Sequence, residues 1–263
     1  MTEASDRLVI LLKEVFGWKE FRPVQKQVID AVYQGEDTLA ILPTGGGKSL
    51  CYQVPGLAKE GICIVISPLI ALMKDQVDYL KARGVKAVAL HAGMSAREID
   101  TLLDNCIRGG VKFLYLSPER LKSELFVERF KQMNLNLIAV DEAHCISEWG
   151  HDFRPEYRNL KRIIDDIGQA PIIALTATAT PKVRHDIMKN LHMLDSKLFL
   201  DSFNRSNLFY EIQPKKDVAK QIIQYINNRK GESGIVYCLS RKKVEEIAEV
   251  LQINGINALP YHA

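Results

Sequence analysis

The chain has 263 residues, of which 47% are hydrophobic and 25% are charged, a composition that is ordinary for one large domain or two smaller ones. No apolar run in this sequence approaches the roughly 18 residues of a membrane span, so no membrane-spanning helix is expected. The net charge is only +3, so a nucleic-acid partner would have to be held by local patches and not by a global field.

No signal peptide is expected from the sequence. Its first residues, MTEASDRLVILLKEVF, lack the small-residue cleavage pattern of a signal peptide. The five cysteines are scattered without a CxxC pair, which argues against a structural zinc site and against a disulfide framework. These features predict a cytoplasmic protein, associated with the nucleoid if the source is bacterial, with no membrane partner.

Short apolar runs alternate with helix-period segments along the first two hundred residues. Near-continuous apolar runs are typical of strands that are buried on both faces of a parallel sheet, so we expect an α/β, RecA-like domain with helices on both faces. The expected strands are 38–43, 62–68, 87–92, 112–118, 137–143 and 171–178, and the expected helices are 22–34, 48–57, 69–82, 95–107, 156–167 and 181–191.

A second α/β pattern follows. Helices are expected over 216–229 and 241–252, with strands over 234–240 and from 256 onward. We therefore predict a first domain over 1–206 and an incomplete second RecA-like domain over 207–263. So few residues give a thin core and unpaired strand edges, and the chain is expected to be a fragment of a longer protein.

The stretch PTGGGKS, residues 43–49, follows an expected strand and precedes an expected helix. Its glycines allow the backbone to wrap closely around an anion, and the N–H groups at the following helix start favour phosphate. Lys48 is predicted to reach the β- and γ-phosphates of ATP, and the Ser49 hydroxyl to bind Mg²⁺. Leu42 stands where the usual P-loop pattern has glycine, but the phosphate cradle lies in residues Thr44, Gly45, Gly46, Gly47, Lys48 and Ser49.

An acidic pair ends the expected strand 137–143, at the edge where α/β folds bind ligands. Asp141 is predicted to hold Mg²⁺, directly or through water, and Glu142 to orient or deprotonate the attacking water. An aromatic-rich stretch follows at once. Trp149 and Phe153 are flanked by polar residues, which favours a surface loop over a core position, whereas packing in the core is plausible for Tyr157.

Taken together, six ordered motifs resemble those of superfamily 2 helicases: FGWKEFRPVQ, LPTGGGKS, SPLIALMKDQV, SPERL, DEAH and LTATAT. The stretch CISEWGHDFRPEY directly after DEAH narrows the resemblance to the RecQ helicase family. The resemblance covers the chain from about residue 10 to its end. It implies an ATP- and Mg²⁺-dependent DNA helicase that acts on single-stranded and partly duplex DNA in the 3′-to-5′ direction, in recombination and repair, with unknown protein partners.

The same resemblance implies individual roles. Trp18 would stack on adenine, and Arg22 and Gln25 would contact the adenine edge and the phosphates. His144 would join Lys48 and the acidic pair in the catalytic set, passing contacts toward the second domain. The residues implied to contact single-stranded DNA are Ser67, Ser117, Trp149, Phe153 and Arg154, and those implied to couple the nucleotide site to DNA are Thr176 and Thr178.

One expected element is missing. Motors of this type complete the ATP site with arginines from the second domain, which stabilise the transition-state charge. After residue 206 only Arg229 and Arg241 are present, and neither lies in the family's Gln-Gly-Arg context. We therefore expect this chain alone to bind nucleotide weakly, to hydrolyse it poorly and not to unwind DNA.

Three other functions stay open at this point. An RNA helicase of the same superfamily would carry DEAD in place of DEAH and would lack the WGHDFRPEY stretch. A nucleotide-gated DNA-binding module without helicase activity would change its DNA affinity with ATP and release no phosphate. A small P-loop kinase would not be expected to have the aromatic-rich stretch or the incomplete second α/β pattern.

Overall fold

The computed structural model describes residues 3–91, 93–122, 124–150, 152–158, 160, 170–202, 204 and 207–262. The chain divides into two compact units, Met1–Arg205 and Ser206–Ala263.

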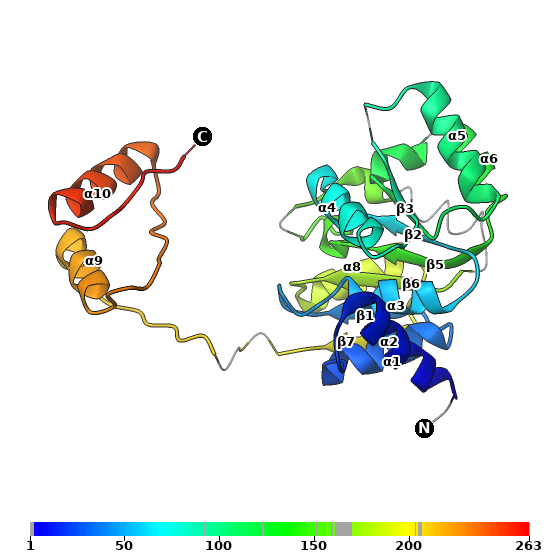
Figure 1. Cartoon of the computed structure of the whole chain (residues 1–263), viewed down its shortest axis with the longest axis horizontal. Helices are drawn as coiled ribbons and strands as arrows, with labels where there is room; N and C mark the ends of the chain where they lie inside the picture. Colours follow the sequence, from blue (N-terminus) through cyan, green and yellow to red (C-terminus); the bar gives the residue numbers. More distant parts are fainter. Residues whose placement is uncertain are drawn as a thin grey trace. The chain divides into compact units, whose positions relative to one another are not determined.

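The first unit is built on a seven-stranded sheet of order β3-β4-β2-β5-β6-β1-β7, in which every pairing is parallel (Figure 1). Five of its strands fall within the predicted ones, and β5 begins two residues before the predicted strand 137–143. The parallel α/β prediction is confirmed. The seventh, at one edge, was not predicted, because its apolar run is only three residues long, 198–200, between Lys197 and Asp201. The strands are β1 (Thr38–Ile41), β2 (Ile62–Ile66), β3 (Ala87–Leu90), β4 (Phe113–Leu116), β5 (Leu135–Val140), β6 (Ile172–Thr176) and β7 (Lys197–Leu200).

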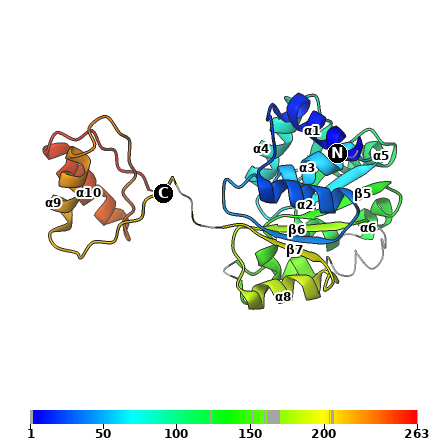
Figure 2. The same ribbon diagram turned by 90° about the horizontal axis from the view of Figure 1, so that it is seen from below.

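Helices cover both faces of this sheet, as predicted. One layer packs on each face through its own apolar cluster, and Figure 2 shows α2 and α8 on opposite sides of β6 and β7. The layer on one face comprises α1 (Glu3–Phe16), α2 (Pro23–Tyr33), α3 (Leu50–Ala58) and α4 (Ile70–Lys81), and that on the other comprises α5 (Ala96–Ile107), α6 (Glu124–Phe130) and α8 (Pro181–Asn190). Of these, α1 and α6 were not predicted.

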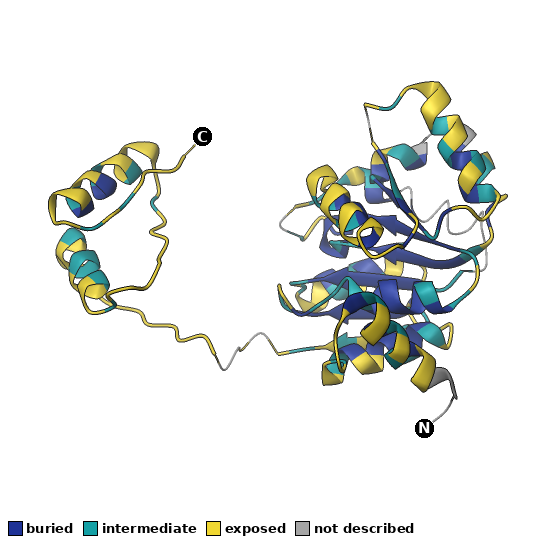
Figure 3. Cartoon of the chain, viewed as in Figure 1, coloured by how far each residue is buried: buried dark blue, intermediate teal, exposed yellow. Residues whose placement is uncertain are grey.

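Strand side chains alternate between the two layers, because successive residues of a strand point to opposite faces. On β2, Ile64 and Ile66 join the cluster with α5, α6 and α8, whereas Val65 joins the cluster with α1 to α4. The sheet is therefore buried throughout its centre (Figure 3). Burial of each such side chain contributes roughly 1.5–3 kcal/mol, which makes the sheet a rigid frame for the loops at its edges.

Two local features matter for the site. The Thr180 hydroxyl accepts a hydrogen bond from the Val183 N–H at 3.4 Å, and together with Pro181 it fixes the start of α8. The predicted helix 156–167 overlaps a short 3₁₀ helix, η3 (Pro155–Arg158), and its residues 159 and 161–167 lie outside the described ranges.

The second unit contains α9 (Val218–Asn227) and α10 (Arg241–Ile253), both as predicted. Ile247, Ala248 and Leu251 form the buried face of α10. The strands predicted over 234–240 and from 256 onward were wrong: residues 207–262 contain no strand. Within this unit no strand lies alongside them, and a strand is stable only when its backbone groups are paired. Tyr237 and Leu239 are accordingly almost fully exposed.

Within the described ranges, no helix combines the length and the apolar character that crossing a bilayer requires.

Candidate nucleotide site and nucleic-acid interface

Five of the predicted site segments follow strands of the sheet. Because the seven strands are parallel, their carboxyl ends share one edge, where ligands bind in folds of this type. The segments that follow strand ends are 43–49 after β1, Ser67 after β2, Ser117 after β4, the Asp141–Glu142 pair after β5, and Thr176 to Thr178 at the end of β6.

The phosphate loop, residues 43–49, turns sharply between β1 and α3. The Gly46 N–H donates to the Pro43 carbonyl at 2.8 Å, and Gly45 and Gly47 have positive φ values of 74° and 76°. Lys48 Nζ lies 3.5 Å from the Leu42 carbonyl, at the end of β1. The loop therefore has the glycine conformations, the adjacent helix start and the cation that an anion cradle requires.

The start of α2 holds this loop from outside. Gln25 Nε2 donates to the carbonyls of Gly46 and Gly47 at 3.0 and 3.2 Å, and its Oε1 accepts from the Arg22 N–H at 2.9 Å. The Arg22 guanidinium donates to the Gly45 carbonyl at 2.9 Å. A β-carbon at Gly47 would displace the Gln25 amide, and the φ of 76° at Gly47 is a conformation that other residues rarely adopt. Sequence reasoning placed both side chains at the nucleotide but missed their bonds to the loop.

Trp18 lies between α1 and α2 and is 59% exposed. Its indole is therefore accessible for the predicted stacking, which stays a prediction.

The acidic pair is fixed by the strand beside it. The Asp141 N–H donates to the Ile66 carbonyl of β2 at 2.8 Å, and the Tyr157 hydroxyl donates to the Asp141 carbonyl at 3.1 Å. Glu142 has a left-handed backbone with φ 48°, and its N–H donates to Asp141 Oδ1 at 3.0 Å. The chain thus turns away from the sheet directly after β5, which aims the two carboxylates differently.

The pKa of Asp141 is raised to about 6, mainly by burial and next by the neighbouring Glu142 charge, whereas the Glu142 N–H and Lys48 act to lower it. The influence of Lys48 indicates that the cation of the phosphate loop lies near the acidic pair. A buried carboxylate next to a second one is a place where a bound cation is favoured.

His144 links the ends of β5 and β6. It lies in a 3₁₀ helix, η2 (Ala143–Ile146), with Nδ1 at 3.3 Å from Glu142 Oε2 and 2.9 Å from Thr176 Oγ1. The Thr176 hydroxyl donates to the Thr178 carbonyl at 3.1 Å, so we assign Nδ1 of His144 as a donor. The proposed catalytic and coupling residues are therefore in direct contact, which no sequence pattern indicated.

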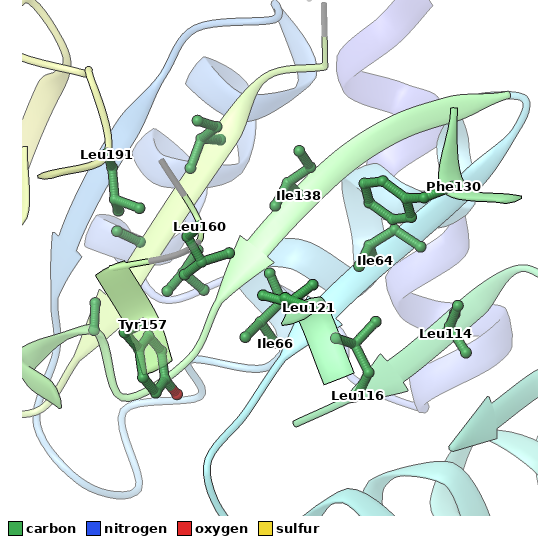
Figure 4. Close-up of a cluster of buried hydrophobic side chains, with 14 of the residues drawn as sticks. Ile64, Ile66, Leu114, Leu116, Leu121, Phe130, Ile138, Tyr157, Leu160 and Leu191 are labelled. Atoms are coloured by element: carbon green, nitrogen blue, oxygen red, sulfur yellow. The ribbon is translucent and has the colours of Figure 1, made fainter. Parts of the chain in front are cut away.

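The aromatic-rich loop, residues 147–157, presents its rings unequally. Trp149 is 62% exposed and Phe153 is partly buried, whereas Tyr157 is 1% exposed and packs in the core beside Leu160 and Ile66 (Figure 4). The plausible core position of Tyr157 is confirmed. A β-carbon at Gly150 would overlap the His144 carbonyl, so this loop also needs glycine for close approach.

Arg154 ties the aromatic-rich loop to the segment after β2. Its Nη1 donates to the Pro68 carbonyl at 3.1 Å, and its Nε and Nη2 both donate to Asp152 Oδ2 at 3.2 Å. The guanidinium therefore spans two of the segments that sequence reasoning assigned to nucleic acid. Its predicted contact with DNA stays a prediction.

A second anchor, missed in the sequence, joins the loop to α8. The Ser147 hydroxyl donates to Asp186 Oδ2 at 2.8 Å and accepts from the Trp149 N–H at 3.2 Å. Lys182 Nζ lies 3.0 Å from the centroid of the Trp149 ring. Lys182 and Asp186 are four residues apart and so share a helix face, but nothing in the sequence pairs that face with this loop.

The two predicted serines differ in accessibility. Ser67 is only 2% exposed, and its hydroxyl has no hydrogen-bond partner among the described residues. Ser117 is partly buried, and its carbonyl accepts from the Arg120 N–H at 3.1 Å. Their predicted contacts with a nucleic-acid backbone stay predictions.

The parallel sheet, its two helical layers and the loops gathered at its carboxyl edge define a RecA-like α/β domain. The sequence profile of the family described as "DEAD/DEAH box helicase" matches residues 22–187, which is more than half of the chain. The chain therefore belongs to the DEAD/DEAH box helicase family.

Relatives of known name refine this. The chain is 45% identical over 253 residues to the "ATP-dependent DNA helicase RecQ" of Pasteurella multocida, covering 96% of this chain and 40% of that protein. It is 42% identical over 265 residues to the "ATP-dependent DNA helicase Q1" of Mus musculus, covering 96% of this chain and 41% of that protein. The chain thus spans about two fifths of the length of these relatives.

Solved structures agree on the fold. The DUF1998 helicase MrfA bound to DNA is similar with a TM-score of 0.70 and 20% identity, over 96% of this chain and 39% of that one. At this identity the similarity concerns the fold alone.

Proposed function

We propose that this chain carries the ATP site and a strand-binding surface of a RecQ-type DNA helicase, which hydrolyses ATP to move along DNA in the 3′-to-5′ direction and unwind it in recombination and repair. The identity to RecQ helicases over nearly the whole chain supports this. The observation that carries it is residues 141–157, which join an acidic pair beside the phosphate loop to an exposed tryptophan. DNA as a substrate would place the protein in the compartment that holds DNA, the cytoplasm if it is bacterial.

In this proposal the phosphate loop binds the β- and γ-phosphates of ATP. Thr44 to Gly47 supply backbone N–H groups, and the Lys48 ammonium contacts the phosphates. Arg22 and Gln25 hold the loop in shape and, with Trp18 against the adenine ring, form the base-side wall. The bonds from α2 to the loop support that positioning role.

Ser49 and Asp141 are proposed to hold Mg²⁺. Both offer oxygen atoms, which this hard cation prefers, and the raised pKa of Asp141 marks a carboxylate that a cation would relieve. When bound, Mg²⁺ supplies positive charge to the phosphate oxygens. The chain's own part is to keep the Asp141 carboxylate at the end of β5 through the bond to Ile66.

Glu142 is proposed as the residue that orients and deprotonates the attacking water. Its left-handed backbone turns the side chain away from that of Asp141, toward His144 at 3.3 Å. The His144 Nδ1–H would hold the Glu142 carboxylate in place and sense whether it carries a proton. Because His144 also contacts Thr176, a shift of the carboxylate would reach the Thr176–Thr178 segment.

Single-stranded DNA is proposed to lie across the segments after β2 and β4 and the aromatic-rich loop. Bases would stack on Trp149 and Phe153, which stabilises binding by roughly 1–3 kcal/mol per base. Arg154 and the backbone near Ser67 and Ser117 would contact phosphates. The bond from Arg154 to the Pro68 carbonyl supports this surface, because it holds two of its segments together.

We propose that full activity also depends on residues outside this chain, which spans about two fifths of the length of its relatives. We propose that Ser206–Ala263 is the beginning of a second RecA-like domain, and that arginines absent from it would complete the ATP site. The chain alone is therefore expected to bind nucleotide weakly and hydrolyse it slowly. A nucleotide-gated DNA-binding module is the second candidate, because the chain covers about two fifths of its relatives.

The test is the ATP turnover rate of this chain, and of a version extended to the length of its relatives, against the concentration of single-stranded DNA or RNA. The proposal expects DNA stimulation that is strong only in the extended version. Preference for RNA would favour an RNA helicase. DNA affinity that depends on ATP, without phosphate release by either version, would favour the binding module.

A further inference from the structure

An ammonium group with no role so far lies on the exposed side of the aromatic-rich loop. Lys182 is in the first turn of α8, directly after the Thr176–Thr178 segment, and is itself exposed. Its Nζ is 3.0 Å from the centroid of the Trp149 ring, a cation–π contact. Trp149 nevertheless stays 62% exposed, so much of the indole is accessible to a base.

This pair is built on a fixed support. The Ser147 hydroxyl, which is fully buried, bonds both the Asp186 carboxylate and the Trp149 N–H. Asp186 lies one helical turn after Lys182, and Ile187 of the same helix is buried in the core. One hydroxyl thus locks the backbone of the tryptophan to the helix that carries the lysine.

We propose that Lys182 is a phosphate-binding residue of the DNA surface, acting together with Trp149, and that Asp186 is the positioning residue for this pair. The inference rests on the proposed function. A base stacked on the indole brings its own phosphate close to the ring edge, where a flexible ammonium can reach it. The cation also strengthens stacking by acting on the same π system.

The consequence is a direct chain of contacts between the proposed DNA surface and the nucleotide site. A phosphate held by Lys182 pulls on the start of α8, which is three residues from Thr178 and capped by Thr180. Thr178 in turn bonds Thr176, the partner of His144. DNA would therefore act on the acidic pair through β6 as well as along the chain from residue 141 to Trp149.

The test uses a natural optical property of the chain. It has two tryptophans, Trp18 and Trp149, so Trp18→Phe makes Trp149 the sole tryptophan reporter. In that background the fluorescence of Trp149 is titrated with single-stranded oligodeoxythymidylate at several KCl concentrations. Lys182→Gln is compared with Lys189→Gln, which removes the same charge from an exposed position on the same helix.

We expect Lys182→Gln to weaken DNA binding about two- to fivefold, the loss of one exposed cation–π and phosphate contact. The slope of log affinity against log salt should fall by about 0.7 in magnitude, one phosphate contact on a single strand. Lys189→Gln should change neither quantity. Equal slopes for Lys182→Gln and Lys189→Gln would overturn the inference and leave the proposed function standing.

If the Trp18→Phe chain shows no DNA binding by fluorescence or by anisotropy of a labelled strand, the proposed function and the inference fail together. The positioning role has its own test without DNA. Asp186→Ala should increase acrylamide quenching of Trp149. Asp186→Asn keeps an acceptor for Ser147, so its quenching should equal that of the chain with Asp186. Unchanged quenching in a folded Asp186→Ala chain, checked by circular dichroism, would remove that role.

Discussion

The phosphate loop and the aromatic-rich loop lie at the same edge of the sheet but are built differently. The proposed cradle of the phosphate loop consists of backbone groups, shaped by glycines and by the side chains of Arg22 and Gln25 at the start of α2. The aromatic-rich loop presents side chains and is held by long-range bonds to Pro68 and Asp186. A phosphate is the same in every nucleotide and suits a fixed backbone site, whereas a moving strand suits rings that accept any base.

The comparison predicts that substitutions in the nucleotide site reduce function more than substitutions on the proposed DNA surface. Glu142→Gln should reduce ATP hydrolysis about 10²- to 10⁴-fold while ATP stays bound, because the amide cannot take a proton from water. Single-turnover hydrolysis and nucleotide affinity check this, measured in the version of the chain that is extended to the length of its relatives. Turnover near that of the unaltered protein would show that a different base is used.

Lys48→Ala should weaken ATP binding about 100-fold or more, because a charge-assisted contact with the phosphates is lost. Affinity is measured by calorimetry or with a fluorescent nucleotide. Lys81→Ala, an exposed lysine in the last turn of α4, is the matched control and should bind like the unaltered chain. Equal affinity in both variants would remove the phosphate-loop assignment.

On the proposed DNA surface, Trp149→Ala combined with Phe153→Ala should weaken single-stranded DNA binding by about 10- to 100-fold. It should also abolish the stimulation of ATP turnover by DNA. Tyr225→Ala, which replaces an exposed tyrosine of α9, serves as the control for loss of a surface ring. Surviving stimulation in the double variant would separate the aromatic-rich loop from the motor.

The smallest expected effect is on folding stability, and it comes from Asp141 in the absence of magnesium. The folded pKa of Asp141 is raised to about 6 from its ordinary 3.8, so the ionised carboxylate costs folding free energy above pH 6, and this cost vanishes below about pH 4. In magnesium-free buffer, Asp141→Asn should therefore raise the unfolding free energy at pH 8 by about 1–3 kcal/mol, and the gain should disappear toward pH 4. Thermal unfolding across this pH range is the measurement. A gain that does not depend on pH would contradict the raised pKa.

Fold prediction succeeded where the signal was local and repeated. Buried strands such as β2 were predicted from their apolar runs, and the helix predicted over 241–252 matches α10 to within one residue. It failed where stability depends on neighbours. The edge strand β7 has only one partner and an apolar run of only three residues, and the predicted strand 234–240 has apolar sequence but no partner. Sequence pattern reports what a segment would bury and not whether a partner is present.

For the site, the sequence by itself determined which residues lie at the carboxyl edge, because strand ends and glycine turns are local features of a parallel sheet. Only the tertiary structure decided how they are held: Gln25 on the phosphate loop, His144 against Thr176, and Lys182 over Trp149. These contacts join residues from 21 to 33 positions apart. Each depends on side-chain geometry across elements, for which local periodicity and turn chemistry carry no signal.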